Sequence, residues 1–178
     1  LYLPHFGVHS PYQAKKELIA KFQDKPAAGG HHDPTYAAMI ASVDESVGRV
    51  LAALEEVKLS ENTLVIFSSD NGGVGGYLRE GIQGGTATDN APLRGGKGML
   101  YEGGIRVPYV FRWPGKIPSG RTCDVPINSV DLYPTLLELA GARPPAGQPL
   151  DGVSYASLLT GGKQELPREA VYWHFPGY

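Results

Sequence analysis

The feature that most constrains the fold is a long helical pattern that runs directly into a short apolar segment. Apolar residues recur at three- and four-residue steps over 34–57, which predicts one helix with a single apolar face. Asp33 followed by Pro34 is typical of an N-cap with proline in the first turn. The continuous apolar run 64–67 indicates a strand buried on both faces. A long helix followed by such a strand is half of a βαβ unit, so we expect an α/β fold with a mostly parallel sheet.

The other expected elements are shorter. The 24 glycines and 15 prolines of the chain indicate many long, shaped loops, and the thirty residues that follow Gly73 have little periodicity, which in a compact domain favours a functional loop. Pro108 interrupts one of the expected strands and places it near an edge or a bend. We expect strands over 1–3, 105–113 and 170–175, and helices over 12–22, 131–140 (ended by Gly141) and 154–160.

Composition excludes several classes of function. A net charge of −2 gives no electrostatic reason to bind nucleic acid or an anionic membrane surface. No apolar run approaches the roughly 20 residues of a membrane span. Cys123 is the single cysteine of the 178 residues, so no internal disulfide can form. The chain starts without Met or a signal-peptide pattern, and both ends resemble strands without neighbours; we therefore expect a piece of a longer protein.

Three positions suggest chemistry, and each also has a simpler interpretation. Asp70-Asn71 follows the strand 64–67, where an α/β protein usually keeps its site, although Asn-Gly is also a common turn. Lys97 lies between glycines, so a tetrahedral anion can approach it closely, although for the lysine alone a solvated surface position is the better interpretation. His9 follows an expected strand end and could donate to an anion or protonate a leaving oxygen, although it could also be bound within its own loop.

Other motifs are excluded by spacing. The lysine of the glycine-rich loop is followed by Gly98, so the segment is not a P-loop, and no dinucleotide fingerprint or EF-hand pattern fits. His31-His32-Asp33 could suggest a metal site, but the N-cap interpretation of Asp33 explains it better.

The chain as a whole resembles the arylsulfatase-like sulfatase family of the alkaline phosphatase superfamily. The residues that carry the resemblance are PHFGVHSP, ASVDESVGRVLAALEE, TLVIFSSDNGG, LRGGKGMLYEGGIRVPYVFRWPGKI, SVDLYPTLLELAG and LDGVSYASLLTG. The resemblance implies a partial domain of an alkaline-phosphatase-like three-layer sandwich with a mostly parallel sheet. Residues 1–162 would be the C-terminal part of the catalytic domain, and 163–178 the start of a truncated C-terminal subdomain.

The resemblance also implies a role for each candidate residue. Asp70 and Asn71 match two calcium ligands, which suits a cation that prefers oxygen donors. His9 matches the histidine that contacts the sulfate and the leaving oxygen, and Lys97 the lysine that grips the sulfate and helps the departing alkoxide. The family's nucleophile is a formylglycine made from a C-x-P-x-R-like motif. Cys123 lies in TCDVP and lacks that pattern, so the nucleophile and the remaining calcium ligands are expected in a missing N-terminal part.

The resulting expectation is a portion of a sulfuric ester hydrolase. Its parent would act on a sulfated small molecule or glycan, while the chain alone would be inactive and calcium-free or loosely occupied. Two alternatives stay open: a phosphate or phosphonate ester hydrolase of the same superfamily, and a non-catalytic chain that binds calcium or glycans. Pairing with a separate N-terminal half, or with a second copy, is a further expectation. Family analogy suggests a periplasmic or secreted protein.

Overall fold

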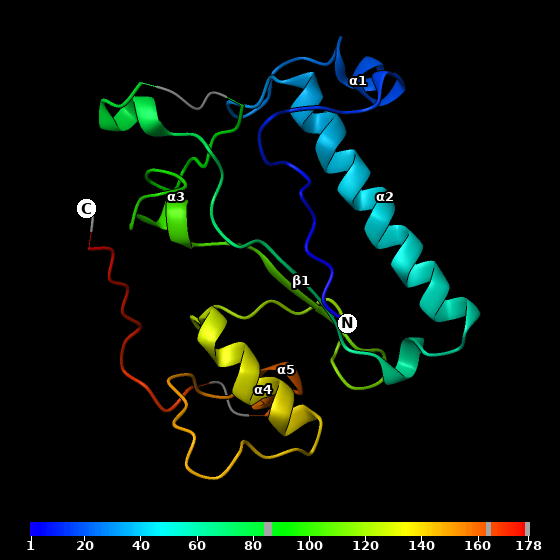
Figure 1. Ribbon diagram of the computed structural model, residues 1–178, viewed down its shortest axis with the longest axis vertical. Coiled ribbons are helices and arrows are strands. Elements are labelled where there is room, and N and C mark those ends of the chain that lie inside the picture. Colours follow the sequence, from blue (N-terminus) through cyan, green and yellow to red (C-terminus); the bar gives the residue numbers. More distant parts are fainter. Residues whose placement is uncertain (84–86, 163–164, 177–178) are drawn as a thin grey trace. The chain divides into compact units, whose positions relative to one another are not determined.

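The computed structural model describes residues 1–83, 87–162 and 165–176 (Figure 1). The chain divides into two compact units: one holds Leu1–Leu59 and Phe67–Tyr109, and the other holds Ser60–Ile66 and Val110–Pro176. The elements, in chain order, are α1 (Lys16–Phe22), α2 (Pro34–Glu56), η1 (Ser60–Asn62), β1 (Val65–Ser68), η2 (Tyr77–Glu80), α3 (Glu102–Ile105), β2 (Tyr109–Arg112), η3 (Ser129–Asp131), α4 (Leu132–Leu139) and α5 (Ala156–Leu159).

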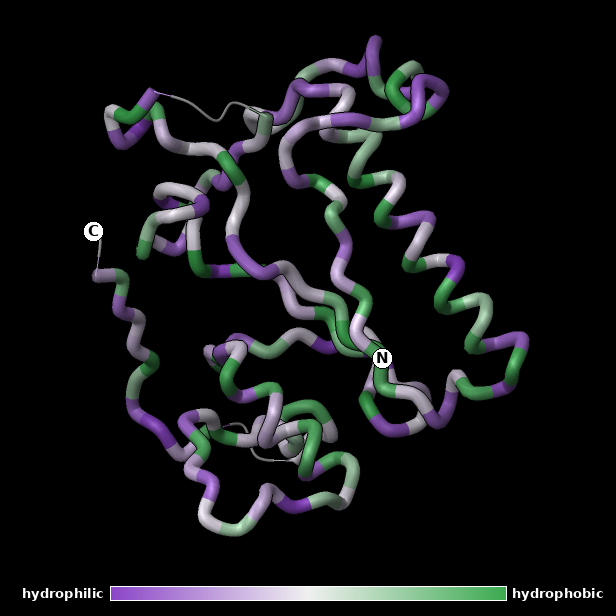
Figure 2. The backbone as a smooth tube through the Cα atoms, viewed as in Figure 1, coloured by the Kyte–Doolittle hydropathy of each residue, from purple (hydrophilic) through white to green (hydrophobic). Residues whose placement is uncertain are grey.

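The first unit is built on α2, which packs against α1. The Asp33 carboxylate accepts hydrogen bonds from the amides of Thr35 at 2.8 Å and Tyr36 at 3.0 Å, so the predicted helix and its N-cap are confirmed. Hydrophobic residues recur along α2 between hydrophilic ones (Figure 2). α1 begins at Lys16, four residues later than the helix predicted over 12–22. Within the described ranges, no helix is both long and apolar enough to span a membrane.

The two strands form a two-stranded sheet. The Ser68 hydroxyl at the end of β1 donates to the Pro108 carbonyl just before β2 at 2.9 Å. The Trp113 indole just after β2 donates to the Glu61 carbonyl before β1 at 3.0 Å. Opposite ends of the strands therefore meet, which means that this pair runs antiparallel. The mostly parallel sheet stays a prediction.

Several strand predictions need correction. β1 is only half-buried, with Phe67 42% exposed, so a strand buried on both faces was wrong. β2 is shorter than the strand predicted over 105–113, since α3 takes up Glu102–Ile105. Segments 1–3 and 170–175 form no strand, and Tyr2 and Tyr172 are 85% and 86% exposed. A strand needs a ladder of hydrogen bonds to a neighbouring strand, and the structure assigns these two segments to no sheet. The predicted domain boundary after Gly162 adjoins 163–164, which lie outside the described residues.

The second unit is organised around the fully buried carboxylate of Asp131. It accepts hydrogen bonds from the amide of Asn128 at 2.7 Å, the amide of Val153 at 3.0 Å and the guanidinium of Arg168 at 2.7 Å. These hydrogen bonds hold the start of η3 and α4. They also bind Val153 and Arg168, which lie 22 and 37 residues further along the chain, to the same point. The helix predicted over 131–140 is thus confirmed, and Gly141 follows it with a left-handed φ of 66°, as a C′ glycine does.

Candidate functional site

The turn that follows β1 offers two oxygen-bearing side chains. Asp70 is exposed and Asn71 is half-buried. The Asn71 amide nitrogen donates to the Gly72 carbonyl at 3.0 Å, which leaves its amide oxygen as the other polar atom of the side chain. The Gly72 amide donates to the Gly104 carbonyl at 2.9 Å. The turn is therefore anchored through its main chain, and a carboxylate and a carboxamide oxygen are the donors that it can offer.

A block of glycines holds Lys97 against this turn. The Lys97 amide donates to the Gly73 carbonyl at 3.0 Å. A Cβ atom on Gly72 would lie 1.8 Å from the Gly103 carbonyl oxygen, and one on Gly96 would lie 2.3 Å from that of Gly75. Since no side chain fits at such distances, main chain packs directly on main chain here. The structure thus brings the Lys97 backbone to the residue that lies two positions after Asn71.

A tyrosine supports the Lys97 loop. The Tyr77 hydroxyl donates to the Lys97 carbonyl at 2.8 Å. Burial raises the pKa of the Tyr77 phenol, and the nearby Tyr12 phenol adds to the rise. Tyr12 also packs edge-on against Tyr36, with ring centroids 5.7 Å apart.

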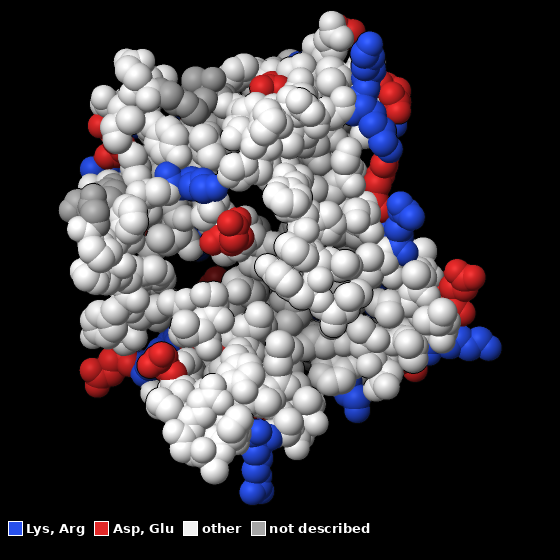
Figure 3. Space-filling view, viewed as in Figure 1, with Lys and Arg blue, Asp and Glu red and all other residues white. Residues whose placement is uncertain are grey.

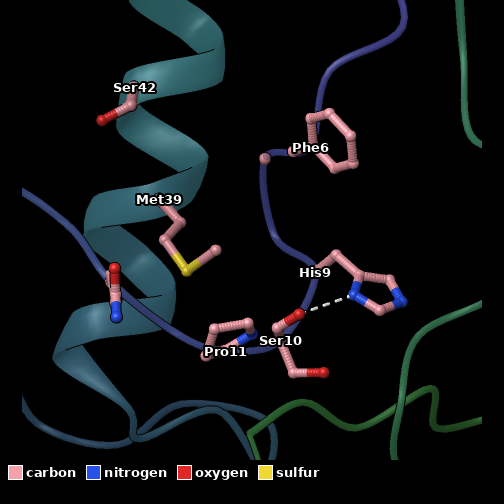
Figure 4. Close-up of a pocket in the computed structure, with 8 residues that line it drawn as sticks. Phe6, His9, Ser10, Pro11, Met39 and Ser42 are labelled. Carbon is pink, nitrogen blue, oxygen red and sulfur yellow. Dashed lines mark hydrogen bonds between the residues drawn. The ribbon is translucent and has the colours of Figure 1, made fainter.

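His9 is exposed and fixed within its own loop. Its Nδ1 lies 2.8 Å from the Ser10 carbonyl, and because a carbonyl only accepts, Nδ1 carries the proton and Nε2 is the second ring nitrogen. His9 lines a recess of about 340 Å³ together with Met39 and Pro11, and its imidazole points away from α2 (Figure 4). No hydrogen bond is described between His9 and Asp70 or Lys97 in the part of the chain that the structure covers. Among the described residues, the structure therefore joins Lys97 to the turn and gives no such bond to His9.

Two ion pairs hold the segments on either side of this site. Both guanidinium nitrogens of Arg79 donate to Asp89, at 3.0 and 2.8 Å, and Arg94 pairs with Glu80 at 2.6 Å. The hydrogen bond from Arg79 is the largest cause that lowers the pKa of Asp89, and the one from Arg94 does the same for Glu80. Arg94 also lies 3.7 Å from the centre of the Tyr101 ring. Elsewhere on the face shown in Figure 3, charges of both signs lie in small separate groups, so any attraction for an anion is local.

Asn90 is a site residue that the sequence did not reveal. Its Oδ1 accepts from the Gly73 amide at 3.1 Å, and its Nδ2 donates to the carbonyls of Gly73 and Gly95 at 3.0 Å each and of Gly75 at 3.4 Å. The segment DNAP around it reads as an ordinary turn. The one available signal was a carboxamide placed inside a glycine-rich segment, and that signal is weak.

Asp70 and Asn71 offer oxygen donors of the kind that calcium prefers. Asp70 and Asn71 supply a carboxylate and an amide carbonyl, which are ligands that Ca²⁺ prefers, but the ion takes 6–8 oxygens. Over residues 1–83, 87–162 and 165–176, no group of three or more His, Cys, Asp and Glu side chains could hold a metal ion. His31-His32-Asp33 forms no such group, and the Asp33 carboxylate caps α2.

Comparison with known proteins identifies the family. The sulfatase family model matches residues 1–142. A sulfatase from Formosa agariphila is 40% identical over 99% of this chain and 32% of its own length. Mouse steryl-sulfatase is 38% identical over 89% of this chain and 25% of its own length. The crystal structure of Ps i-CgsB in complex with k-i-k-neocarrahexaose has a TM-score of 0.73 and 38% identity, over 88% of this chain and 32% of that one.

The chain belongs to the sulfatase family. It spans about a quarter to a third of the length of the relatives that it matches. Its fold is part of the domain seen in the solved sulfatase structure that it resembles.

Proposed function

We propose that this chain is the C-terminal part of a sulfatase catalytic domain whose parent protein hydrolyses a sulfate ester. The observation that carries the proposal is the framework that holds Lys97 on the Asp70-Asn71 turn through the hydrogen bond to Gly73. This bond joins an ammonium-bearing residue to the turn that carries Asp70 and Asn71, inside the segment that the sulfatase model matches. Positive charge close to an anionic tetrahedral group stabilises the charge that develops on it in the transition state.

The chain's own residues would bind the sulfate and assist the leaving group. Lys97, as a flexible point charge with three donors, binds sulfate oxygens. His9, when protonated, has Nδ1–H bound to the Ser10 carbonyl and offers Nε2–H to the leaving oxygen, which turns a poor alkoxide leaving group into an alcohol. Neutral His9 would offer Nε2 as an acceptor only, so this step requires the imidazolium.

Asp70 and Asn71 would hold a calcium ion, together with ligands from the missing part. When bound, the ion neutralises charge that develops on the sulfate oxygens. The family resemblance implies a formylglycine as the attacking group. The segment around Cys123 lacks the C-x-P-x-R pattern, so this group would lie in the N-terminal part of the parent. For the chain alone we therefore propose no measurable turnover and weak calcium binding.

A sulfated glycan is the proposed substrate class. Its support is the likeness to a structure described as a complex with a neocarrahexaose, although a relative named steryl-sulfatase makes a sulfated small molecule the alternative. By family analogy the parent is exported to the periplasm or secreted, and it would work through the joined N- and C-terminal parts or as a homo-oligomer.

The test compares variants of the intact parent protein on a chromogenic aryl sulfate and the matching aryl phosphate. We expect hydrolysis of the sulfate, with Lys97→Ala and His9→Ala each lowering kcat by about 10²–10⁴-fold, the range for lost acid–base and electrostatic groups. Lys116→Ala is the matched control, since this lysine is exposed and lies in the other unit. Faster turnover of the phosphate, or full activity of the Lys97 variant, would overturn the proposal.

A further inference from the structure

We infer that Asn90 is a positioning residue that holds Lys97 in register with the Asp70-Asn71 turn. The inference rests on the proposed function, because it assigns a role in the same site. Its basis is the pair of segments that the Asn90 side chain joins: Gly73 lies two positions after Asn71, and Gly95 lies two positions before Lys97.

A carboxamide is the one side chain of this size that makes both kinds of bond. Oδ1 accepts from the Gly73 amide at 3.1 Å, and Nδ2 donates to the Gly73 and Gly95 carbonyls at 3.0 Å. An aspartate in the same volume could accept from the Gly73 amide but could donate to neither carbonyl when ionised. The Asn90 amide nitrogen therefore connects the Gly73 segment to the Gly95 segment, and an ionised aspartate could not donate these bonds.

The backbone on both sides of Asn90 is held in place by other contacts. The neighbouring Asp89 carboxylate accepts from the Ala91 amide at 2.8 Å and is paired with Arg79. On the other side, Thr88 forms a bridge with Gly75, and a Cβ atom on Gly75 would lie only 1.8 Å from the Thr88 carbonyl oxygen. The backbone that carries Asn90 thus lies directly against the segment that its side chain binds.

Loss of Asn90 should change the distance between Lys97 and the turn rather than the strength of substrate binding. Without Asn90, the Lys97 segment and the turn would still share the bond between the Lys97 amide and the Gly73 carbonyl, so the site would persist but with more freedom. A displacement of about 1 Å at a catalytic group can cost about 10²-fold in rate. We therefore expect the loss in kcat and in kcat/KM together, as for an interaction that is felt in the transition state.

The experiment uses the intact parent protein and two variants, with an aryl sulfate as substrate and amide hydrogen exchange as a second measurement. Asn90→Ala should lower kcat by about 10²-fold and speed exchange of the Gly73 amide at least about tenfold, since that amide loses its acceptor. Asn90→Asp should keep the Gly73 amide protected through Oδ1 yet leave kcat as low as in the alanine variant. Asn62→Ala, at an exposed asparagine of η1, should change neither.

Coupling to Lys97 separates positioning from a purely structural role. In a Lys97→Ala background, Asn90→Ala should reduce kcat by less than about threefold, because the group that it positions is already gone. Full additivity of the two losses, or recovery of kcat in Asn90→Asp, would overturn the inference. The exchange measurement does not depend on activity. Unchanged exchange of the Gly73 amide in Asn90→Ala would therefore refute the positioning role of Asn90. A wild-type parent that is inactive on the sulfate would refute the proposed function instead.

Discussion

Replacing Gly72 by alanine tests whether the site depends on main chain packed against main chain. The new Cβ atom would lie 1.8 Å from the Gly103 carbonyl oxygen, where real contacts stay beyond 3.0 Å, so the two segments must separate by more than an ångström. The separation strains the bond between the Gly72 amide and the Gly104 carbonyl. Overpacking costs about 1–3 kcal/mol and a lost hydrogen bond about 1 kcal/mol, so we expect about 2–4 kcal/mol of lost stability.

Gly48→Ala is the matched control. Gly48 lies within α2, and a Cβ atom there has no neighbour within 4 Å. Alanine removes backbone freedom from the unfolded chain and favours the helix, so this variant should be about 0.5–1 kcal/mol more stable than the wild type. The same chemical change thus has opposite expected signs at two positions of one unit.

The assay is urea unfolding of the intact protein, followed by aryl sulfate turnover below the transition. Gly72→Ala should unfold at lower urea and lose about 10²-fold in kcat, because the turn moves relative to Lys97, whereas Gly48→Ala should keep wild-type kcat. A Gly72 variant with the wild-type midpoint and turnover would refute the packing of Gly72 against Gly103.

Three further predictions concern stability. Asp131→Asn should lower the unfolding free energy by about 3–5 kcal/mol, since it leaves the guanidinium of Arg168, 17% exposed, without its buried partner; urea unfolding checks this, and an unchanged midpoint would contradict it. Asp33→Ala should cost about 1 kcal/mol through loss of the N-cap of α2, with faster exchange of the Thr35 and Tyr36 amides as its local readout. Pairing lowers the pKa of Asp89 and Glu80, so their contribution is complete above their ordinary pKa of about 4 and is lost as the pH falls through the lowered values. The protection factor of the Ala91 amide, which is its exchange rate relative to the intrinsic rate at the same pH, should therefore fall in acid, and a pH-independent protection factor would be evidence against it.

Elements with local causes were predictable from the sequence. The helix over 34–57 carries its own apolar stripe and its own N-cap in Asp33, and the helix that ends before Gly141 carries its own stop signal. Such elements need no information from distant parts of the chain. The family, too, followed from the order of residues around Lys97, and the sulfatase model confirms it.

Elements with distant causes were not predictable. A strand at 1–3 or 170–175 depends on neighbours that the pattern of apolar residues does not reveal, and the exposure of Phe67 depends on what covers its face of the sheet. Asn90 acts through atoms of Gly73, 17 residues away, so only the folded chain reveals it. The roles of Asp70, Asn71, His9 and Lys97 stay predictions.

The main-chain packing around Gly72 also bears on how this protein could be re-engineered. A framework made of backbone atoms leaves no side chain to vary, so a library directed at it would yield mostly non-functional variants. The neighbouring exposed side chains of Leu78 and Ile82, 58% and 48% exposed, border the same loop without belonging to that framework. Selection for a new substrate should therefore accumulate changes at such border positions while Gly72, Gly96 and Gly103 stay fixed.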